Sequence, residues 1–337
     1  PPRSTPKPSS AASDVYKRQA VHCEALGYNR FWVSEHHNNQ TIVGTAPEIL
    51  MAAIASKTKT IRVGSAGIML PHYSAFKVAE QFRVLDSLAP GRIDLGLGRA
   101  PGSDGRTAFA LNPLANERPA QFPSDVRDLV AWVTGGPLID KHPFGALEAF
   151  PKGDTAPEVW ILGSSNYGAQ IAAHFGLPYC FAWFFSDGRG AAEAVEIYRR
   201  SFQPSNLCQE PYVGLCVWAF AAETEEEAQF HYSSRAKWKI FRERGLFLPI
   251  EPPEVALQQE YDGRERERLE RDRATAFIGT PSKVMEQLKC LGAEMAIDEM
   301  ALVAWVYDED VRRKSFSLIA NAADLPKLES GAQASSA

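Results

Sequence analysis

The chain has 337 residues, of which 45% are hydrophobic and 23% are charged, and its formal net charge is −5 at pH 7. This composition is typical of a soluble globular protein, and the apolar runs fall short of the roughly 20 residues that a membrane-spanning helix needs. No concentrated basic stripe is present, which argues against nucleic-acid binding, so we expect a small-molecule partner.

The five cysteines lie far apart, and no two of them form a C-x-x-C pair. An odd number of widely spaced cysteines argues against a disulfide framework and against a zinc ribbon. We therefore expect the protein to be cytoplasmic.

The two ends of the chain differ in composition from the rest. Residues 1–19 are rich in proline and serine, are basic, and lack the apolar core of a signal peptide. We expect this segment to be disordered and non-native to the fold, because the globular pattern begins abruptly at about Ala20. We expect residues 326–337 to be a disordered tail by composition. A single domain then covers residues 20–325.

From Ala20 onward, helical and strand patterns alternate. Aromatic and β-branched runs predict seven strands, near residues 31, 61, 92, 158, 179, 213 and 299. Such alternation, with strands that are apolar on both faces, predicts a parallel sheet covered by helices, either open and doubly wound or closed into a barrel. A (β/α)8 barrel needs eight strands, and the eighth would precede the helix at about residue 20. Residues 223–280 are charged and aromatic, and we interpret them as a partly helical insertion that could serve as a lid.

The triplet Glu35-His36-His37 follows the first predicted strand, at the end where barrel enzymes build their sites. Neighbouring strand side chains point to opposite sides, so the two histidines cannot both face one ion, and we predict no metal site. The residues alone leave two interpretations open: an acid/base centre, or histidines satisfied by local hydrogen bonds.

Two loops carry residues suited to anions. The first loop is "GRIDLGLGRAPGSDGR", where Pro101 stands at a position that the dinucleotide-binding fingerprint G-x-G-x-x-G requires to be glycine, so this fingerprint is excluded. Arg99 of this glycine-flanked loop could bind a phosphate or carboxylate, or it could pair with a surface acid. In "WILGSSNYGAQIAA" a strand ends before Ser164 and Ser165, and a helix follows. The serines could bind an anion at the helix N-terminus or act as plain caps.

A third feature is the run of small residues Ser65, Ala66 and Gly67 at the end of a strand. A flat ring could lie against the backbone there, although small residues are common at a barrel rim.

Three blocks together resemble the bacterial luciferase-like family of flavin-dependent monooxygenases, and its single-chain luciferase-like oxidoreductases in particular. These blocks are "LGYNRFWVSEHH", "VGSAGIMLPHYSAFKVAEQFRVLDSLAPGRIDLGLGRAPGSD" and "ILGSSNYGAQIAAHFGLPY". The resemblance implies an α/β fold, a TIM (β/α)8 barrel with a late insertion at about 223–280. The family's first strand is apparently missing or replaced here, because the Pro/Ser-rich run stands in its place, which would open one wall of the barrel.

The resemblance also implies roles for individual residues. It makes His36 the catalytic histidine facing the flavin, and Arg99 the residue that holds the FMN phosphate. Ser164 and Ser165 fall in the family's phosphate loop, which the backbone near Gly168 closes. Ala66 and Gly67 fall where the family often has a non-proline cis peptide beneath the flavin ring.

The resemblance implies monooxygenase activity. Reduced FMN would react with O2 to form a flavin hydroperoxide, which oxygenates a small organic substrate. A separate flavin reductase, bound transiently, would supply the reduced FMN. A homodimer would follow the family's habit. Two alternatives remain: a non-catalytic flavin-binding protein, and a deazaflavin-dependent hydride-transfer dehydrogenase of the same superfamily.

Overall fold

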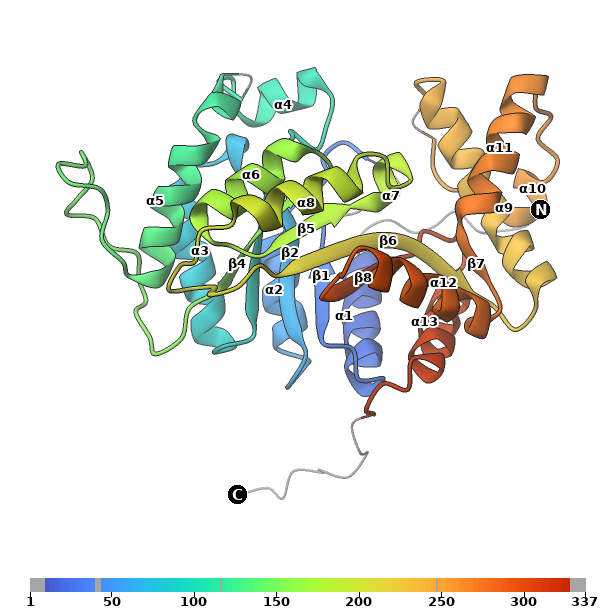
Figure 1. Ribbon diagram of the computed structural model, residues 1–337, viewed down its shortest axis with the longest axis horizontal. Coiled ribbons are helices and arrows are strands. Elements are labelled where there is room, and N and C mark those ends of the chain that lie inside the picture. Colours follow the sequence, from blue (N-terminus) through green and yellow to red (C-terminus); the bar gives the residue numbers. More distant parts are fainter. Residues whose placement is uncertain (1–9, 40–43, 116, 247, 328–337) are drawn as a thin grey trace.

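The computed structural model describes residues 10–39, 44–115, 117–246 and 248–327, which form one curled parallel sheet with helices around it (Figure 1). The strands are β1 (Arg30–Val33), β2 (Arg62–Met69), β3 (Ile93–Gly98), β4 (Glu158–Gly163), β5 (Tyr179–Ala182), β6 (Val213–Ala221), β7 (Phe277–Gly279) and β8 (Glu299–Val303).

The helices alternate with these strands along most of the chain. They are α1 (Ser10–Ala25), α2 (Pro47–Ala55), α3 (Ala75–Leu88), α4 (Gly105–Leu111), α5 (Phe122–Thr134), α6 (Asn166–Phe175), α7 (Trp183–Ser186), α8 (Ala191–Ser201), α9 (Glu225–Glu243), α10 (Pro253–Ala256), α11 (Gly263–Thr275), α12 (Pro281–Glu294) and α13 (Glu309–Ala322). Two 3-10 turns, η1 (Leu70–His72) and η2 (Arg118–Ala120), follow β2 and precede α5.

Adjacent strands pair in parallel in the order β1 to β7, and β8 pairs with β6. Within the described residues, β1 pairs only with β2 and β8 only with β6, so the sheet curls as an open barrel with a seam between β1 and β8. This confirms the predicted α/β barrel class with one strand lacking. All seven expected strands are present. A further short strand, β7, pairs with the end of β6 and lies at the end of the segment expected to be the insertion, so it is not the barrel strand expected before residue 20.

The N-terminal segment differs from the expectation of disorder up to residue 19. Residues 10–19 form the first part of helix α1. Proline and serine dominate only up to residue 10, whereas the stretch from Ala11 to Gln19 holds ordinary helix formers, which explains the earlier start. Residues 1–9 lie outside the described residues, and so do residues 328–337, which make up most of the expected C-terminal tail.

Helices α9, α10 and α11 lie between β6 and β7, in the segment expected to be the insertion, and stand together at one side of the molecule (Figure 1). The hydroxyl of Thr224 caps α9 by accepting a hydrogen bond from the Glu227 backbone N–H. Because strand side chains alternate, Trp218 and Phe220 share one face of β6, where they pack against Tyr232 and other residues of α9. The insertion is therefore anchored on the inner face of the sheet.

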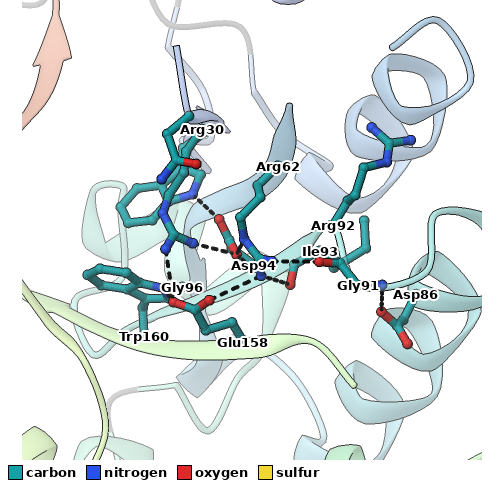
Figure 2. A network of polar contacts seen from close by, with 12 residues as sticks. Arg30, Arg62, Asp86, Gly91, Arg92, Ile93, Asp94, Gly96, Glu158 and Trp160 are labelled. Atoms are coloured by element: carbon teal, nitrogen blue, oxygen red, sulfur yellow. Dashed lines mark hydrogen bonds and ion pairs between the residues drawn. The ribbon is translucent and has the colours of Figure 1, made fainter. Parts of the chain in front are cut away.

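A polar network joins the amino ends of the neighbouring strands β1, β2, β3 and β4 (Figure 2). The fully buried Asp94 carboxylate accepts hydrogen bonds from Arg30 (2.9 Å), Arg62 (2.8 Å) and the Trp32 indole (2.8 Å). Arg30 also donates to Glu299 of β8 at 2.9 Å. Side chains thus connect β1 to β8 where no backbone pairing does.

No helix among the described residues combines the length and the apolar character needed to cross a bilayer.

Replacing Asp94 should destabilise the protein strongly, because two partly buried arginines would lose a fully buried counter-ion that they share. We expect Asp94→Ala to lower the free energy of unfolding by about 3–5 kcal/mol, the range for breaking a buried ion pair. Urea unfolding followed by circular dichroism measures the difference. Glu196→Ala, which removes an exposed i,i+4 pair with Arg200, is the control and should change stability by less than about 0.5 kcal/mol. Equal effects of the two substitutions would contradict the structural role of Asp94.

Candidate functional site

The predicted site residues follow β1, β2, β3 and β4, which are consecutive in the sheet. Parallel pairing aligns the carboxyl ends of these strands at one edge, as the register Trp32 to Gly64 and Leu97 to Ile161 illustrates. The loops that follow the four strands are therefore neighbours. In a parallel α/β sheet this edge is the usual place for a ligand.

Glu35 organises the first of these loops. Its fully buried carboxylate lies 2.7 Å from Nε2 of His37, accepts a hydrogen bond from the Tyr73 hydroxyl at 2.7 Å, and accepts one from the Met69 backbone N–H at 2.8 Å. Burial, together with the nearby Glu35 carboxylate, raises the pKa of Tyr73, which therefore remains a donor at neutral pH. His37 thus forms a hydrogen bond with Glu35 and supports the loop after β1.

His36 makes contacts different from those of Glu35 and His37. Its Nδ1 lies 3.3 Å from the Gly102 carbonyl, and its backbone N–H donates to Gly44 at 2.8 Å. Because a carbonyl only accepts, a neutral His36 carries its proton on Nδ1 and keeps Nε2 as a proton acceptor. Burial lowers the pKa of His36 below its ordinary value of 6.5, and the Arg242 cation of α9 acts in the same direction, while the Gly102 carbonyl opposes them.

His72, in η1, was not singled out from the sequence. It is 6% exposed, its Nε2 donates to the Pro101 carbonyl at 2.7 Å, and its ring lies edge-on to His37 with centroids 5.9 Å apart. His72 thus ties the turn after β2 to the loop after β3. An isolated histidine in "MLPHY" carries no sequence signal for this contact.

The Ala66–Gly67 peptide bond is cis, as the resemblance implied, and it coincides with a register shift between β2 and β3. A Cβ atom added at Gly67 would lie 2.7 Å from the Gly96 carbonyl oxygen and 2.9 Å from a Leu162 methyl group. The backbones of β2, β3 and β4 therefore approach one another closely here, and only glycine fits at position 67.

The structure brings Arg99 and the loop after β4 together. The Arg99 guanidinium stacks over the ring of Tyr167, in the first turn of α6, 4.0 Å from the ring centroid. Ser164 and Ser165 are exposed just before that turn, and the Ser165 side chain makes no cap hydrogen bond. Tyr167 is a second residue that the sequence analysis does not single out, although it is the second residue of the helix that follows Ser164 and Ser165.

Gly168 is buried inside α6, where it packs against the strand that precedes it. A Cβ at Gly168 would meet the Tyr179 ring at 3.4 Å and the Gly163 Cα at 3.6 Å. This close approach fixes the position of the helix N-terminus, with its unsatisfied backbone N–H groups. Arg99 thus lies against the first turn of the helix that follows the two serines, and a guanidinium, hydroxyls and a helix N-terminus are each donors suited to a phosphate.

Among the described residues, no group of three or more His, Cys, Asp or Glu side chains is arranged to hold a metal ion. This edge of the sheet also carries a partly buried imidazole, His36, whose pKa is lowered by burial, and a cation, Arg99, on the loop after β3.

Known proteins match most of this chain. The family model described as "Luciferase-like monooxygenase" matches residues 2–299. A protein named luciferase-like monooxygenase from Escherichia coli is 36% identical over 88% of this chain and 86% of its own length. The N-acetyl-S-alkylcysteine monooxygenase of Bacillus subtilis is 35% identical, with 89% of each chain covered.

Solved structures agree on the fold. Apo-MsnO8 superposes with a TM-score of 0.85 at 31% identity, covering 95% of each chain. The oxygenating constituent of 3,6-diketocamphane monooxygenase from Pseudomonas putida, solved in complex with FMN, has a TM-score of 0.68 at 19% identity, with 97% of this chain and 96% of that chain covered. An F420-dependent secondary alcohol dehydrogenase has a TM-score of 0.64 at 16% identity, with 91% and 93% covered.

The expected enzyme class, an oxidoreductase that incorporates molecular oxygen, is confirmed by the monooxygenase names among these relatives. A family model that matches nearly the whole chain, together with relatives above 30% identity along almost all of it, settles the assignment: this chain belongs to the luciferase-like monooxygenase family.

Proposed function

We propose that this protein is a flavin-dependent monooxygenase that uses reduced FMN and O2 to oxygenate a small organic substrate. The observation that carries the proposal is the stacking of Arg99 on Tyr167, in the helix that directly follows Ser164 and Ser165; Arg99 is also only three residues from Gly102, whose carbonyl contacts His36. A separate reductase would supply the reduced flavin, and a homodimer would follow the family's habit.

The residues present fit FMN. Arg99 and the N–H groups at the start of α6, with Ser164 and Ser165, would hold the phosphate, since guanidinium and helix N-termini are the preferred donors for that group. The close-packed backbone at Ala66 and Gly67 offers a flat surface for the ring. When bound, the reduced flavin supplies the reaction with oxygen, which no amino-acid side chain can supply.

The protein's own contribution is proton transfer and shelter from water. His36 is more than half-buried, its Nδ1 faces the Gly102 carbonyl, and its lowered pKa keeps it neutral near pH 7, so Nε2 can accept a proton. Glu35, through His37, Tyr73 and Met69, holds the loop that carries His36. Helix α9 brings Arg242 to the same side, where it would help to exclude bulk water.

Arg99→Ala should weaken FMN binding by about 1.5–3 kcal/mol, roughly 10- to 150-fold in Kd, because a hydrogen bond to a charged phosphate is lost. Fluorescence titration with FMN measures the change. Riboflavin, which lacks the phosphate, should bind both proteins equally. Arg106→Ala, an exposed arginine at the start of α4, is the matched control. If the control variant loses as much affinity, or riboflavin suffers equally, the phosphate assignment is wrong.

His36→Ala should reduce the oxygenation rate by about 10²- to 10⁴-fold and leave FMN affinity nearly intact, since a positioned acid/base contributes to the reaction and little to binding. The assay couples the protein to a flavin reductase and follows product from a panel of thioethers, aldehydes and aromatic compounds by mass spectrometry. His174→Ala, which changes an exposed histidine of α6, should retain the wild-type rate. A wild-type rate for His36→Ala would remove His36 from the mechanism.

The pH dependence follows from the direction of the His36 shift. Burial lowers its pKa below 6.5, so the neutral, proton-accepting form predominates at pH 7 and is lost only as the pH falls through that lowered value. We expect the oxygenation rate to be flat around pH 7 and to fall at more acidic pH, and His36→Gln to lack this acidic limb. A limb that persists in His36→Gln would belong to another group. Mass spectrometry of the extracted cofactor tests FMN against a deazaflavin.

A further inference from the structure

Two adjoining cavities lie outside the site described above, beyond the carboxyl end of β5. The larger, of about 360 Å³, opens between the turn that follows α7 and the C-terminal half of α11; its lining comprises Ser186, Asp187, Gly188, Arg189, Arg268, Arg271, Asp272 and Thr275. The smaller, of about 20 Å³, shares Asp187, Asp272 and Thr275 with it and extends inward to Trp218 and Arg235. The larger volume falls in the range of small-molecule sites, and the smaller has room for a single water.

A set of ion pairs fastens the walls together. Lys239 of α9 lies 2.6 Å from Asp187 and 3.0 Å from Asp272, which is 5% exposed. Arg268 pairs with the same two carboxylates and, at 3.4 Å, with Glu243. Both aspartates that line the cavities are thus fully engaged with cations, so they neither repel an incoming anion strongly nor compete for further partners.

Additional cations at the cavities lack carboxylate partners. Arg189 and Arg271 line the larger cavity and are exposed, and neither forms an ion pair with any described residue. Positive charge is therefore in excess around the opening. Two guanidiniums that line one cavity and have no ion-pair partner among the described residues can recognise an oxyanion, because each presents paired N–H donors.

The inner cavity supplies an independent sign of a ligand. Arg235 is 5% exposed, stacks on the Trp218 ring at 4.4 Å, and its Nε has no hydrogen-bond partner; the Trp218 indole N–H has none either. Burial lowers the pKa of Arg235, which reflects the cost of holding this cation away from water. Buried donors are almost always satisfied in proteins, so two of them at one cavity indicate an acceptor that fills it.

We propose that these cavities form an anion-binding site, in which a small organic molecule places a carboxylate or phosphate group between Arg189 and Arg271 and reaches Arg235 and Trp218 directly or through one water. This site is separate from the Arg99 loop and does not depend on the proposed flavin chemistry. It joins the turn after β5 to the helices α9 and α11, so an occupant would bridge the barrel and the insertion.

Isothermal titration calorimetry of the full chain with inorganic phosphate and, separately, with malonate tests the proposal. Low ionic strength is needed because salt screens exposed charges. We expect saturable one-to-one binding of at least one of the two anions, and the tighter one identifies the head group. Arg189→Ala and Arg271→Ala should each weaken that binding by about tenfold.

The controls separate this site from its alternatives. Arg273→Ala removes an exposed arginine of the same helix that lines neither cavity, and it should leave anion affinity unchanged. Each titration is repeated in the Arg99→Ala background, which removes the phosphate ligand proposed for the flavin site, so that only binding at the second site is scored. Absence of saturable binding by both anions, full affinity in Arg189→Ala and Arg271→Ala, or an equal loss in Arg273→Ala would each overturn the proposal.

Discussion

The structure depends on Arg30, whose side chain spans the seam of the open barrel. Its guanidinium contacts Asp94 at 2.9 Å, Glu158 at 3.2 Å and Glu299 at 2.9 Å, so strands β1, β3, β4 and β8 share one cation. Hydrogen bonds between strands normally close a barrel, but none joins β1 to β8 within the described residues. A buried, multiply bonded arginine can perform this role because its planar donors serve several carboxylates at once.

That closure at the amino ends of the strands leaves the opposite edge available for function. There the loops after β1, β2 and β3 are held to one another by short polar contacts: Glu35 binds Met69 and Tyr73, and His72 binds Pro101. Each contact crosses from one loop to the next. The imidazole of His36 is therefore positioned by neighbouring backbone, because its Nδ1 lies 3.3 Å from the Gly102 carbonyl and its N–H donates to the Gly44 carbonyl.

The helices between β6 and β7 connect the two sites discussed above. One face of α9 packs on Trp218 and Phe220, its Arg242 reaches the surroundings of His36, and its Arg235 and Lys239 border the second set of cavities. Helix α9 is anchored by apolar packing and by ion pairs at the same time. A ligand bound between α7 and α11 would therefore stabilise the helix whose Arg242 acts electrostatically on His36.

The sequence alone determined the parallel α/β class and the seven strands outside the insertion. It also determined which loops carry His36, Arg99, Ser164 and Ser165. These features follow from local patterns, namely strand and helix periodicities and glycine-bounded loops. Tertiary structure alone decided that Tyr167 lies under Arg99, that Glu35 gathers His37, Tyr73 and Met69, and that β7 is a strand. These features arise from contacts between segments distant in the chain, or from packing that overrides a weak local signal, and no local pattern encodes them.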